Sequence, residues 1–313
     1  MATLFHTEQV LIGQVGKYKI VKQLQKAVWL ARNQVHKDVI VKSVQDHPRV
    51  ANERDVLKIF TPRSKHIRPL LDEIVDPAEP TTIVLSHLQS TLLQASVRQK
   101  LNRTELKYVC RGVLEALAVM HSEGYVHADV KADNILVNEK PDQTNRFTDV
   151  QLADMGNSYP EAHEYALEGQ PIGAPMWSSP EVLMHLPWDT KTDIWSFGTL
   201  LISLIYGRDF NIFDPQDVPT DPLDDYKFAV LRRQVEIFGP FPVKYQEIAN
   251  EDVMELIVWM LENLKESRTP FQNVADGEIS RKDKDFISWI MRLDPRDRPT
   301  AAAILSHGWW HGE

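Results

Sequence analysis

A polar stretch near the middle of the chain contains residue types that can accept a proton, neutralise an anion and hold a hard cation. Residues 127–134 read HADVKADN, and Asp154 follows twenty residues after Asn134, directly before Met-Gly. The carboxylate of Asp129 can accept a proton from a hydroxyl, and the ammonium of Lys131 can neutralise phosphate charge. The amide oxygen of Asn134 and the carboxylate of Asp154 are ligands that suit Mg²⁺. The spacing predicts one reaction centre, although Asp and Asn also favour loops as simple turn formers.

Regular elements on both sides of this stretch must hold it in place. Apolar residues at helical spacing predict a helix over residues 106–120, with Gly124 as its stop. Short apolar runs at residues 135–137 and 150–153 flank a polar turn and predict a hairpin. A helix over residues 193–206 is apolar nearly all round, so we expect it to be buried. Further helices are expected over residues 226–238, 251–264 and 282–293.

The first part of the chain, to about residue 85, predicts strands rather than helices. Val56, Leu57 and Phe60 stand at helical spacing and predict one short helix over residues 52–60. Residues 86–89 lack apolar periodicity and predict a connector. The order is therefore a small strand-rich lobe, a connector and a larger helical lobe. The expected strands cover residues 18–24, 27–32, 38–44 and 81–85.

Composition and charge exclude several classes of protein. Of the 313 residues 43% are hydrophobic and 25% charged, which is typical of a globular domain. The single cysteine, Cys110, excludes a disulfide scaffold, and no apolar run reaches the length of a membrane span. No secretory signal is visible, so we expect an intracellular protein in the cytoplasm, the nucleus or both. The net charge of −9 divides into +4 over residues 1–89 and −13 over the rest, which does not suit a nucleic-acid-binding protein.

The chain resembles a eukaryotic-type protein kinase over nearly its whole length. Six segments carry the likeness in the family's order, where one alone would be weak. They are VIVK at residues 39–42, HADVKADN at 127–134, DMG at 154–156, GAPMWSSPE at 173–181, DIWSFG at 193–198 and DPRDRPT at 294–300. The resemblance implies an α+β, bilobal kinase fold over residues 1–313, with lobes of about 1–88 and 89–313. Because little chain follows Thr300, no regulatory domain is expected after it.

The resemblance also implies a role for each polar residue of the centre. Asp129 would orient the substrate hydroxyl and accept its proton, and Lys131 would neutralise the transferring phosphoryl group and favour Ser or Thr as acceptor. Asn134 and Asp154 would hold Mg²⁺. Lys42, fixed by Glu53, would hold the α- and β-phosphates of ATP.

Further residues follow from the same likeness. Asp193 would tie down the backbone of residues 127–134, and Glu181 would pair with Arg298 as a buried structural contact. Leu85 would take the gatekeeper place and begin the hinge that offers backbone groups to adenine. The implied ATP-binding residues are Lys42, Glu53, Val28, Ile40, Leu85, His87, Leu88 and Leu136.

The sequence departs from the family pattern at four places. No glycine occurs among residues 22–27, where the glycine-rich loop belongs, and the turn is shortened. Because such a loop brings backbone N–H groups to the phosphates, its loss predicts weaker ATP binding or a different phosphate cover. Ile40 replaces the usual alanine in the roof of the adenine site. Ala128 replaces an arginine that receives an activation-loop phosphate, and Ala174 replaces a threonine that bonds the catalytic loop.

Three functions fit these residues. The first is an ATP- and Mg²⁺-dependent Ser/Thr protein kinase; the alternatives are a pseudokinase that acts as a binding scaffold and a small-molecule phosphotransferase. Residues 238–242 resemble an insert of the cyclin-dependent and splicing-factor kinase branch. Glu161, Glu164 and Glu168 make the activation segment acidic, which predicts a basic protein substrate or an ordinary solvated loop. We expect a monomer without nucleic-acid or membrane partners.

Overall fold

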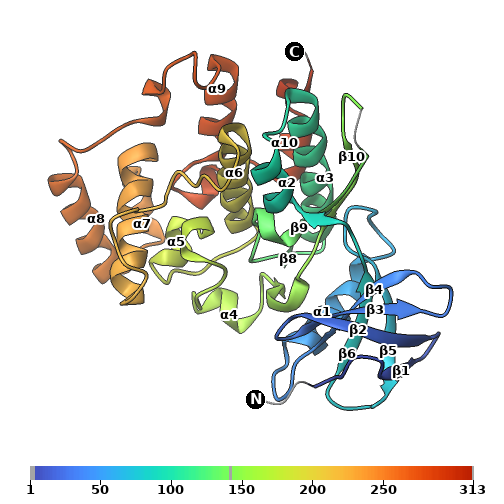
Figure 1. Ribbon diagram of the computed structural model, residues 1–313. Coiled ribbons are helices and arrows are strands. Elements are labelled where there is room, and N and C mark those ends of the chain that lie inside the picture. Colours follow the sequence, from blue (N-terminus) through green and yellow to red (C-terminus); the bar gives the residue numbers. More distant parts are fainter. Residues whose placement is uncertain (1–3, 141–142, 312–313) are drawn as a thin grey trace.

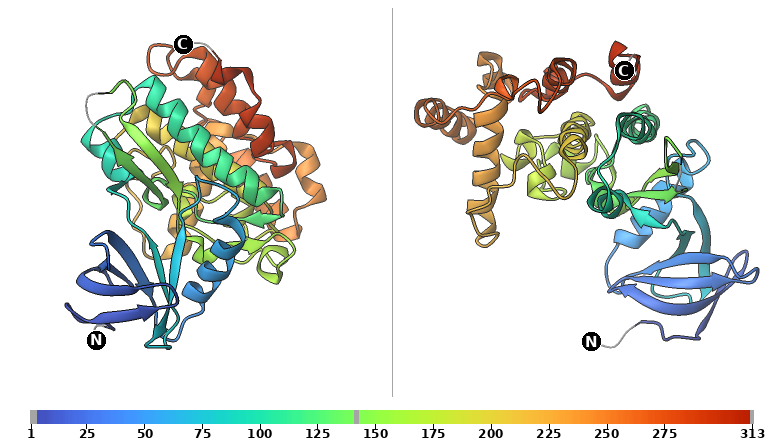
Figure 2. Two further views of the ribbon diagram at one scale, coloured as in Figure 1. Left: turned by 90° about the vertical axis from the view of Figure 1, so that its right-hand side faces the viewer. Right: turned by 45° about the horizontal axis from the view of Figure 1, so that its top comes forward.

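The computed structural model describes residues 4–140 and 143–311, which form two lobes of unequal size (Figure 1). The two views in Figure 2 keep the blue N-terminal lobe at one end of the molecule and the orange C-terminal helices at the other. The bilobal α+β architecture is the one predicted. The outermost positions of the expected domain, 1–3 and 312–313, lie outside the described residues.

The N-terminal lobe is a closed barrel of six strands in the order β1-β2-β3-β4-β6-β5. β1 and β5 were not among the expected strands, and their pairing closes the sheet that the other four would leave open. The buried Asp72 of β5 joins the two ends, because its carboxylate accepts N–H groups from Val15 and Gly16 and the Tyr18 hydroxyl. The strands are β1 (Val10–Gly13), β2 (Lys17–Gln25), β3 (Val28–Asn33), β4 (Asp38–Ser43), β5 (Leu70–Asp76) and β6 (Thr82–Ser86).

One helix, α1 (Arg49–Phe60), lies between the barrel and the larger lobe. It starts three residues before the predicted position, because the prediction rested on Val56, Leu57 and Phe60 and left out the first turn, where Val50 is also buried. Leu57 and Phe60 belong to a core cluster that also contains Leu114 of α3 and Leu200 of α6. The two lobes therefore share apolar packing through this helix.

The C-terminal lobe is mostly helical and is built around α3 and α6. Asn102 and Glu105 form a capping box that starts α3, and Gly207, at φ 83°, ends α6. Among the described residues, no helix is both long and apolar enough to cross a bilayer. The helices are α2 (Leu92–Arg98), α3 (Arg103–His121), α4 (Glu164–Leu167), α5 (Pro180–Leu183), α6 (Lys191–Tyr206), α7 (Leu223–Phe238), α8 (Glu251–Asn263), α9 (Arg281–Ile290) and α10 (Ala301–Leu305).

Short strands in this lobe frame the polar stretch. β9 and β10 form the predicted hairpin, and β7 adds to the β9 edge. β11, which follows Asp154, pairs with β8, which precedes His127. This pairing brings the two chemistry-bearing segments side by side. The strands are β7 (Ser90–Thr91), β8 (Tyr125–Val126), β9 (Ile135–Glu139), β10 (Phe147–Leu152) and β11 (Tyr159–Pro160).

Candidate active site

The loop between β8 and β9 is held by one carboxylate of α6. Asp193 accepts hydrogen bonds from the backbone N–H groups of His127, at 2.8 Å, and Ala128, at 2.9 Å. Nε2 of His121 lies 2.9 Å from the same carboxylate. Ala128 has a left-handed φ of 69°, which costs a non-glycine residue roughly 1–3 kcal/mol, so the loop needs these contacts to keep its shape. The contact expected of Asp193 is present.

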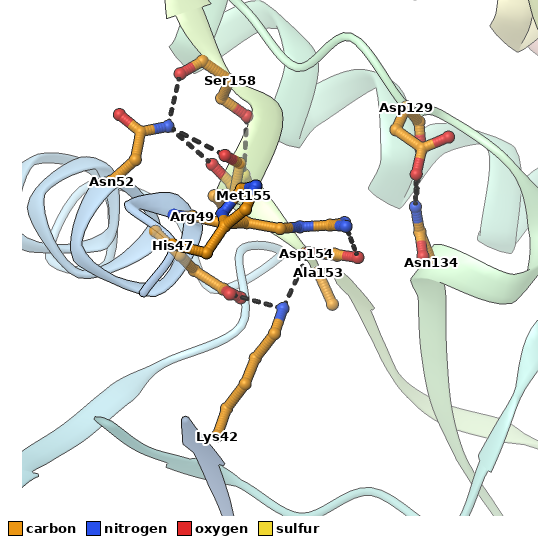
Figure 3. A network of polar contacts seen from close by, with 12 residues as sticks. Lys42, His47, Arg49, Asn52, Asp129, Asn134, Ala153, Asp154, Met155 and Ser158 are labelled. Carbon is orange, nitrogen blue, oxygen red and sulfur yellow. Dashed lines mark hydrogen bonds and ion pairs between the residues drawn. The ribbon is translucent and has the colours of Figure 1, made fainter. Parts of the chain in front are cut away.

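Three of the predicted catalytic and metal-binding residues form one hydrogen-bonded group in this loop. Lys131 Nζ donates to Oδ1 and Oδ2 of Asp129 at 2.9 and 2.8 Å. Asn134 Nδ2 donates to the backbone oxygen and to Oδ2 of Asp129, both at 2.8 Å (Figure 3). Asp129 is buried and its carboxylate is fixed from two sides. A carboxylate so placed can accept a proton from a hydroxyl brought to it.

The second half of the site joins the barrel to the larger lobe. Lys42 Nζ, on β4, lies 2.5 Å from Oε2 of Glu53 on α1 and donates to Oδ1 of Asp154 at 2.8 Å. The expected ion pair between Lys42 and Glu53 is therefore present, and the Glu53 side chain is only 1% exposed. Asp154 itself has a left-handed φ of 65°, so its carboxylate is presented by a strained backbone.

Asp154 has a second cationic partner that the sequence did not reveal. Arg49, the first residue of α1, donates from Nη2 to Oδ2 of Asp154 at 2.7 Å (Figure 3). Burial alone would raise the pKa of the Asp154 carboxyl, but the Lys42 ammonium and the Arg49 guanidinium hold it well below its usual value. The carboxylate is ionised and bound on both oxygens.

Asn52 was also missed and fastens the same helix to the same loop. Its Nδ2 donates to the backbone oxygens of Gly156, at 3.1 Å, and Ser158, at 3.0 Å. Asn52 and Glu53 stand three and four residues after Arg49, so each neighbours it on the surface of α1. This spacing, counted back from Glu53, is the sequence signal that could have identified Arg49 and Asn52.

The turn between β2 and β3, where the glycine-rich loop belongs, is short, as predicted. Gln25 pairs with Val28 across the β2–β3 hairpin, so only Lys26 and Ala27 form its turn. Bulges interrupt β2 on the approach to this turn. The hairpin has neither the length nor the glycines of a loop that wraps phosphates with backbone N–H groups.

The residues expected around adenine come from both lobes. Ile40 of β4 and Leu85 of β6 are cross-strand partners and are buried, so the roof is closed beside the gatekeeper position. Val28 of β3 and Leu136 of β9 are half-buried, which leaves a partly open apolar residue on each lobe for a planar ring. In the connector His87 is exposed and Leu88 is buried.

The arrangement suits Mg²⁺. Because the Asn134 amide nitrogen donates to Asp129, its oxygen is left for a cation. Each carboxylate oxygen of Asp154 can accept more than one partner, so it can bind a cation beside Lys42 and Arg49. Within residues 4–140 and 143–311, no cluster of three or more His, Cys, Asp or Glu side chains offers a protein-only metal site. This pattern matches Mg²⁺, which takes few protein ligands and adds substrate phosphates.

Contacts with residues outside it hold both ends of the segment from Asp154 to Glu181. Ser158 is buried and its hydroxyl donates to the backbone oxygen of His127 at 3.1 Å. The expected structural pair is present at the far end, where Arg298 donates to both carboxylate oxygens of Glu181 at 2.6 and 2.7 Å. These contacts hold the segment against the larger lobe.

Comparisons with known proteins agree with this architecture. Over 226 residues the chain is 32% identical to Serine/threonine-protein kinase PAK 4 of Mus musculus, covering 72% of this chain and 30% of that protein. The corresponding match to Serine/threonine-protein kinase PAK mbt of Drosophila melanogaster is 26% identical and covers 28% of that protein. The chain therefore spans less than a third of the length of these relatives. A Probable casein kinase II subunit alpha homolog of Encephalitozoon cuniculi is 25% identical over 95% of this chain and 89% of its own.

A solved structure and a family model extend the match to the whole chain. The crystal structure of the yeast RNA Pol II CTD kinase CTDK-1 complex contains a chain that superposes with a TM-score of 0.75 at 16% identity, covering 100% of this chain and 97% of the other. At that identity the likeness concerns the fold. The family model described as "Protein kinase domain" matches residues 6–310. The chain belongs to the protein kinase domain family.

Proposed function

We propose that this domain is an ATP- and Mg²⁺-dependent protein kinase that phosphorylates Ser or Thr hydroxyls. The observation that carries the proposal is that both halves of the phosphoryl-transfer set are assembled at once. Asp129, Lys131 and Asn134 form one bonded group, and Lys42 joins Glu53 to Asp154. Two of the relatives named above are Ser/Thr kinases by name, which supports the same acceptor.

The chain's own residues account for the steps of transfer. Asp129 orients the acceptor hydroxyl and receives its proton as the oxygen–phosphorus bond forms. Lys131, held beside Asp129, neutralises the charge on the transferring group, while the bond from the γ-phosphorus to the β–γ bridging oxygen breaks and ADP leaves. Lys42 holds the α- and β-phosphates. Asn134 and Asp154 would hold Mg²⁺, which supplies charge neutralisation at the phosphates when bound.

We propose a basic protein segment as substrate. Glu161, Glu164 and Glu168 are exposed on the activation segment, and residues 90–313 carry the whole negative excess of the chain. Opposite charges steer association and raise its rate at low salt. Peptides with Lys or Arg around the acceptor should be phosphorylated faster than acidic peptides, and added salt should reduce the difference.

We further propose one domain with lobes of about 1–88 and 89–313, acting as a monomer in the cytoplasm or nucleus without nucleic-acid or membrane partners. The shared core of the lobes and the single buried Cys110 support a compact unit in a reducing compartment. Light scattering of the purified domain tests the monomeric state, and imaging of a tagged chain tests the localisation.

Label transfer from γ-labelled ATP with Mg²⁺ to a basic Ser/Thr peptide tests the function. We expect transfer by the wild type and its loss in Asp129→Asn and Lys42→Met. A thermal shift with nucleotide but no transfer to any peptide would favour the pseudokinase. Transfer to a small hydroxyl compound but not to peptides would favour the small-molecule phosphotransferase.

A further inference from the structure

The phosphate site lacks the backbone cover that its chemistry calls for. The two-residue turn at Lys26 and Ala27 contains no glycine, so it cannot fold backbone N–H groups around a phosphate. A triphosphate brings several negative charges into a site where Glu53, Asp129 and Asp154 already contribute three carboxylates. A further donor, besides Lys42, Lys131 and the proposed Mg²⁺, would take the place of that backbone cover.

Arg49 has free donor capacity at the right place. Its Nη2 bonds Oδ2 of Asp154 while Lys42 bonds Oδ1, so the two cations flank one carboxylate. A guanidinium carries five N–H donors, and among the described residues the buried Nε of Arg49 has no hydrogen-bond partner. Its side chain is 34% exposed, so a ligand can approach it.

The local structure directs Arg49 to the site although a cation at this position is unfavourable for α1. A cation at the first position of a helix opposes the helix dipole, and α1 has no acidic residue in its first turn and no side-chain cap. Gly156 lets the side chain cross the loop, because a Cβ atom there would collide with Cγ and Nε of Arg49. In Figure 3 the arginine reaches from α1 over this loop to Asp154. The ion pair with Asp154 offsets part of this cost and aims the guanidinium at the site.

We propose that Arg49 is a phosphate-binding residue that replaces the missing glycine-rich cover. When nucleotide enters, its guanidinium turns its unused N–H donors to the oxygens of the β- and γ-phosphates, beside Lys42. A guanidinium suits this task because its fork matches phosphate oxygens in pairs. The inference rests on the proposed function, since it assigns a ligand to the nucleotide of that site.

An alternative hypothesis predicts the opposite change in nucleotide affinity. If Arg49 only occupies Asp154 in the nucleotide-free protein, Mg²⁺ must displace it, and removing the arginine should tighten binding of Mg²⁺·ADP. If Arg49 binds phosphate, removing it should weaken the binding of ADP and ATP and leave the binding of adenosine unchanged. The affinity series therefore separates the two.

The test is titration calorimetry of ATP, ADP and adenosine, each with Mg²⁺ and with EDTA, on four proteins. They are wild type, Arg49→Gln, Arg49→Lys and the matched control Arg54→Gln, which removes a cation of the same helix that pairs with Asp55 and Glu73. We expect Arg49→Gln to bind ADP and ATP about 10- to 100-fold more weakly, the loss expected for charge-assisted hydrogen bonds. Arg49→Lys should lie between, and Arg54→Gln should match wild type.

Adenosine serves as the control for folding. Unchanged adenosine affinity with weakened ADP supports the proposal, whereas equal losses for all three ligands, no change, or tighter Mg²⁺·ADP would each overturn it. If wild type binds and transfers phosphate while Arg49→Gln behaves identically, only this inference fails. If wild type binds no nucleotide, the proposed function fails together with it.

Discussion

The two halves of the site are held together by different kinds of contact. The catalytic loop is fixed within the larger lobe, where buried Asp193 bonds its backbone and Asp129 is held by its own neighbours. The nucleotide half depends on α1, whose Arg49 and Asn52 reach across to residues more than 100 positions later in the chain. The catalytic loop is therefore held by contacts within one lobe. The half of the site that would hold the phosphates depends on contacts between the two lobes.

The largest effect should come from a substitution in the catalytic loop. We expect Asp129→Asn to lower kcat about 10²- to 10⁴-fold while leaving the affinity for Mg²⁺·ADP unchanged, because the general base touches the acceptor and not the nucleotide. Steady-state kinetics and calorimetry measure the two quantities. Asp133→Asn, an exposed carboxylate of the same loop, is the matched control. Equal losses in both variants would contradict the assignment.

Removing the tether of the catalytic loop should cost stability as well as rate. Asp193→Asn replaces one of the two acceptor oxygens by an amide N–H₂ group, so one loop N–H group loses its acceptor, and we expect a decrease of about 1–3 kcal/mol in the free energy of unfolding. Urea unfolding measures it, with Asp285→Asn, exposed on α9, as control. A variant as stable as wild type would show that the strained Ala128 backbone holds without this tether.

A smaller effect should follow from loosening the interlobe half. Asn52→Ala removes the bonds from α1 to the oxygens of Gly156 and Ser158, each worth about 1 kcal/mol. We expect kcat to fall about tenfold and amide exchange in residues 155–158 to accelerate, with a loss of about 1–2 kcal/mol in the free energy of unfolding. Arg54→Gln on the same helix should do neither. Faster exchange without loss of rate would separate Asn52 from catalysis.

The smallest effect should be seen at Cys110, which reports on the larger lobe alone. Burial raises the pKa of its thiol to about 12, so at pH 8 the thiolate fraction is about three orders of magnitude below that of a free cysteine. We expect iodoacetamide to leave the native protein unlabelled, and labelling to rise only as pH approaches 12 or the lobe opens. Asp193→Asn should speed labelling and Asn52→Ala should not; the reverse order would break the contrast between the two halves.

The same contrast decides what the sequence could predict. The catalytic loop was predictable because Asp129, Lys131 and Asn134 are near neighbours in the chain and share one loop. Arg49 and Asn52 were missed because their partners are distant in sequence, and contacts of that kind depend on how α1 docks. Only Glu53 was found there, through its place in a family pattern.

The missed strands have equally physical reasons. β1 contains only four residues and buries one of them, Leu11, so it leaves no alternating pattern. β5 contains three carboxylates, which mask a strand whose buried Asp72 serves as a hydrogen-bond acceptor for the β1–β2 turn. Apolar patterns detect strands and helices that face a core, and they overlook elements whose interior contacts are polar.

Phosphoryl transfer by the purified wild-type domain tests the central claim most directly. The domain should transfer label from γ-labelled ATP to a basic peptide only with Mg²⁺, and acid hydrolysis should return the label on phosphoserine or phosphothreonine. Binding of Mg²⁺·ATP without transfer to any hydroxyl, or label recovered only on tyrosine, would contradict the account.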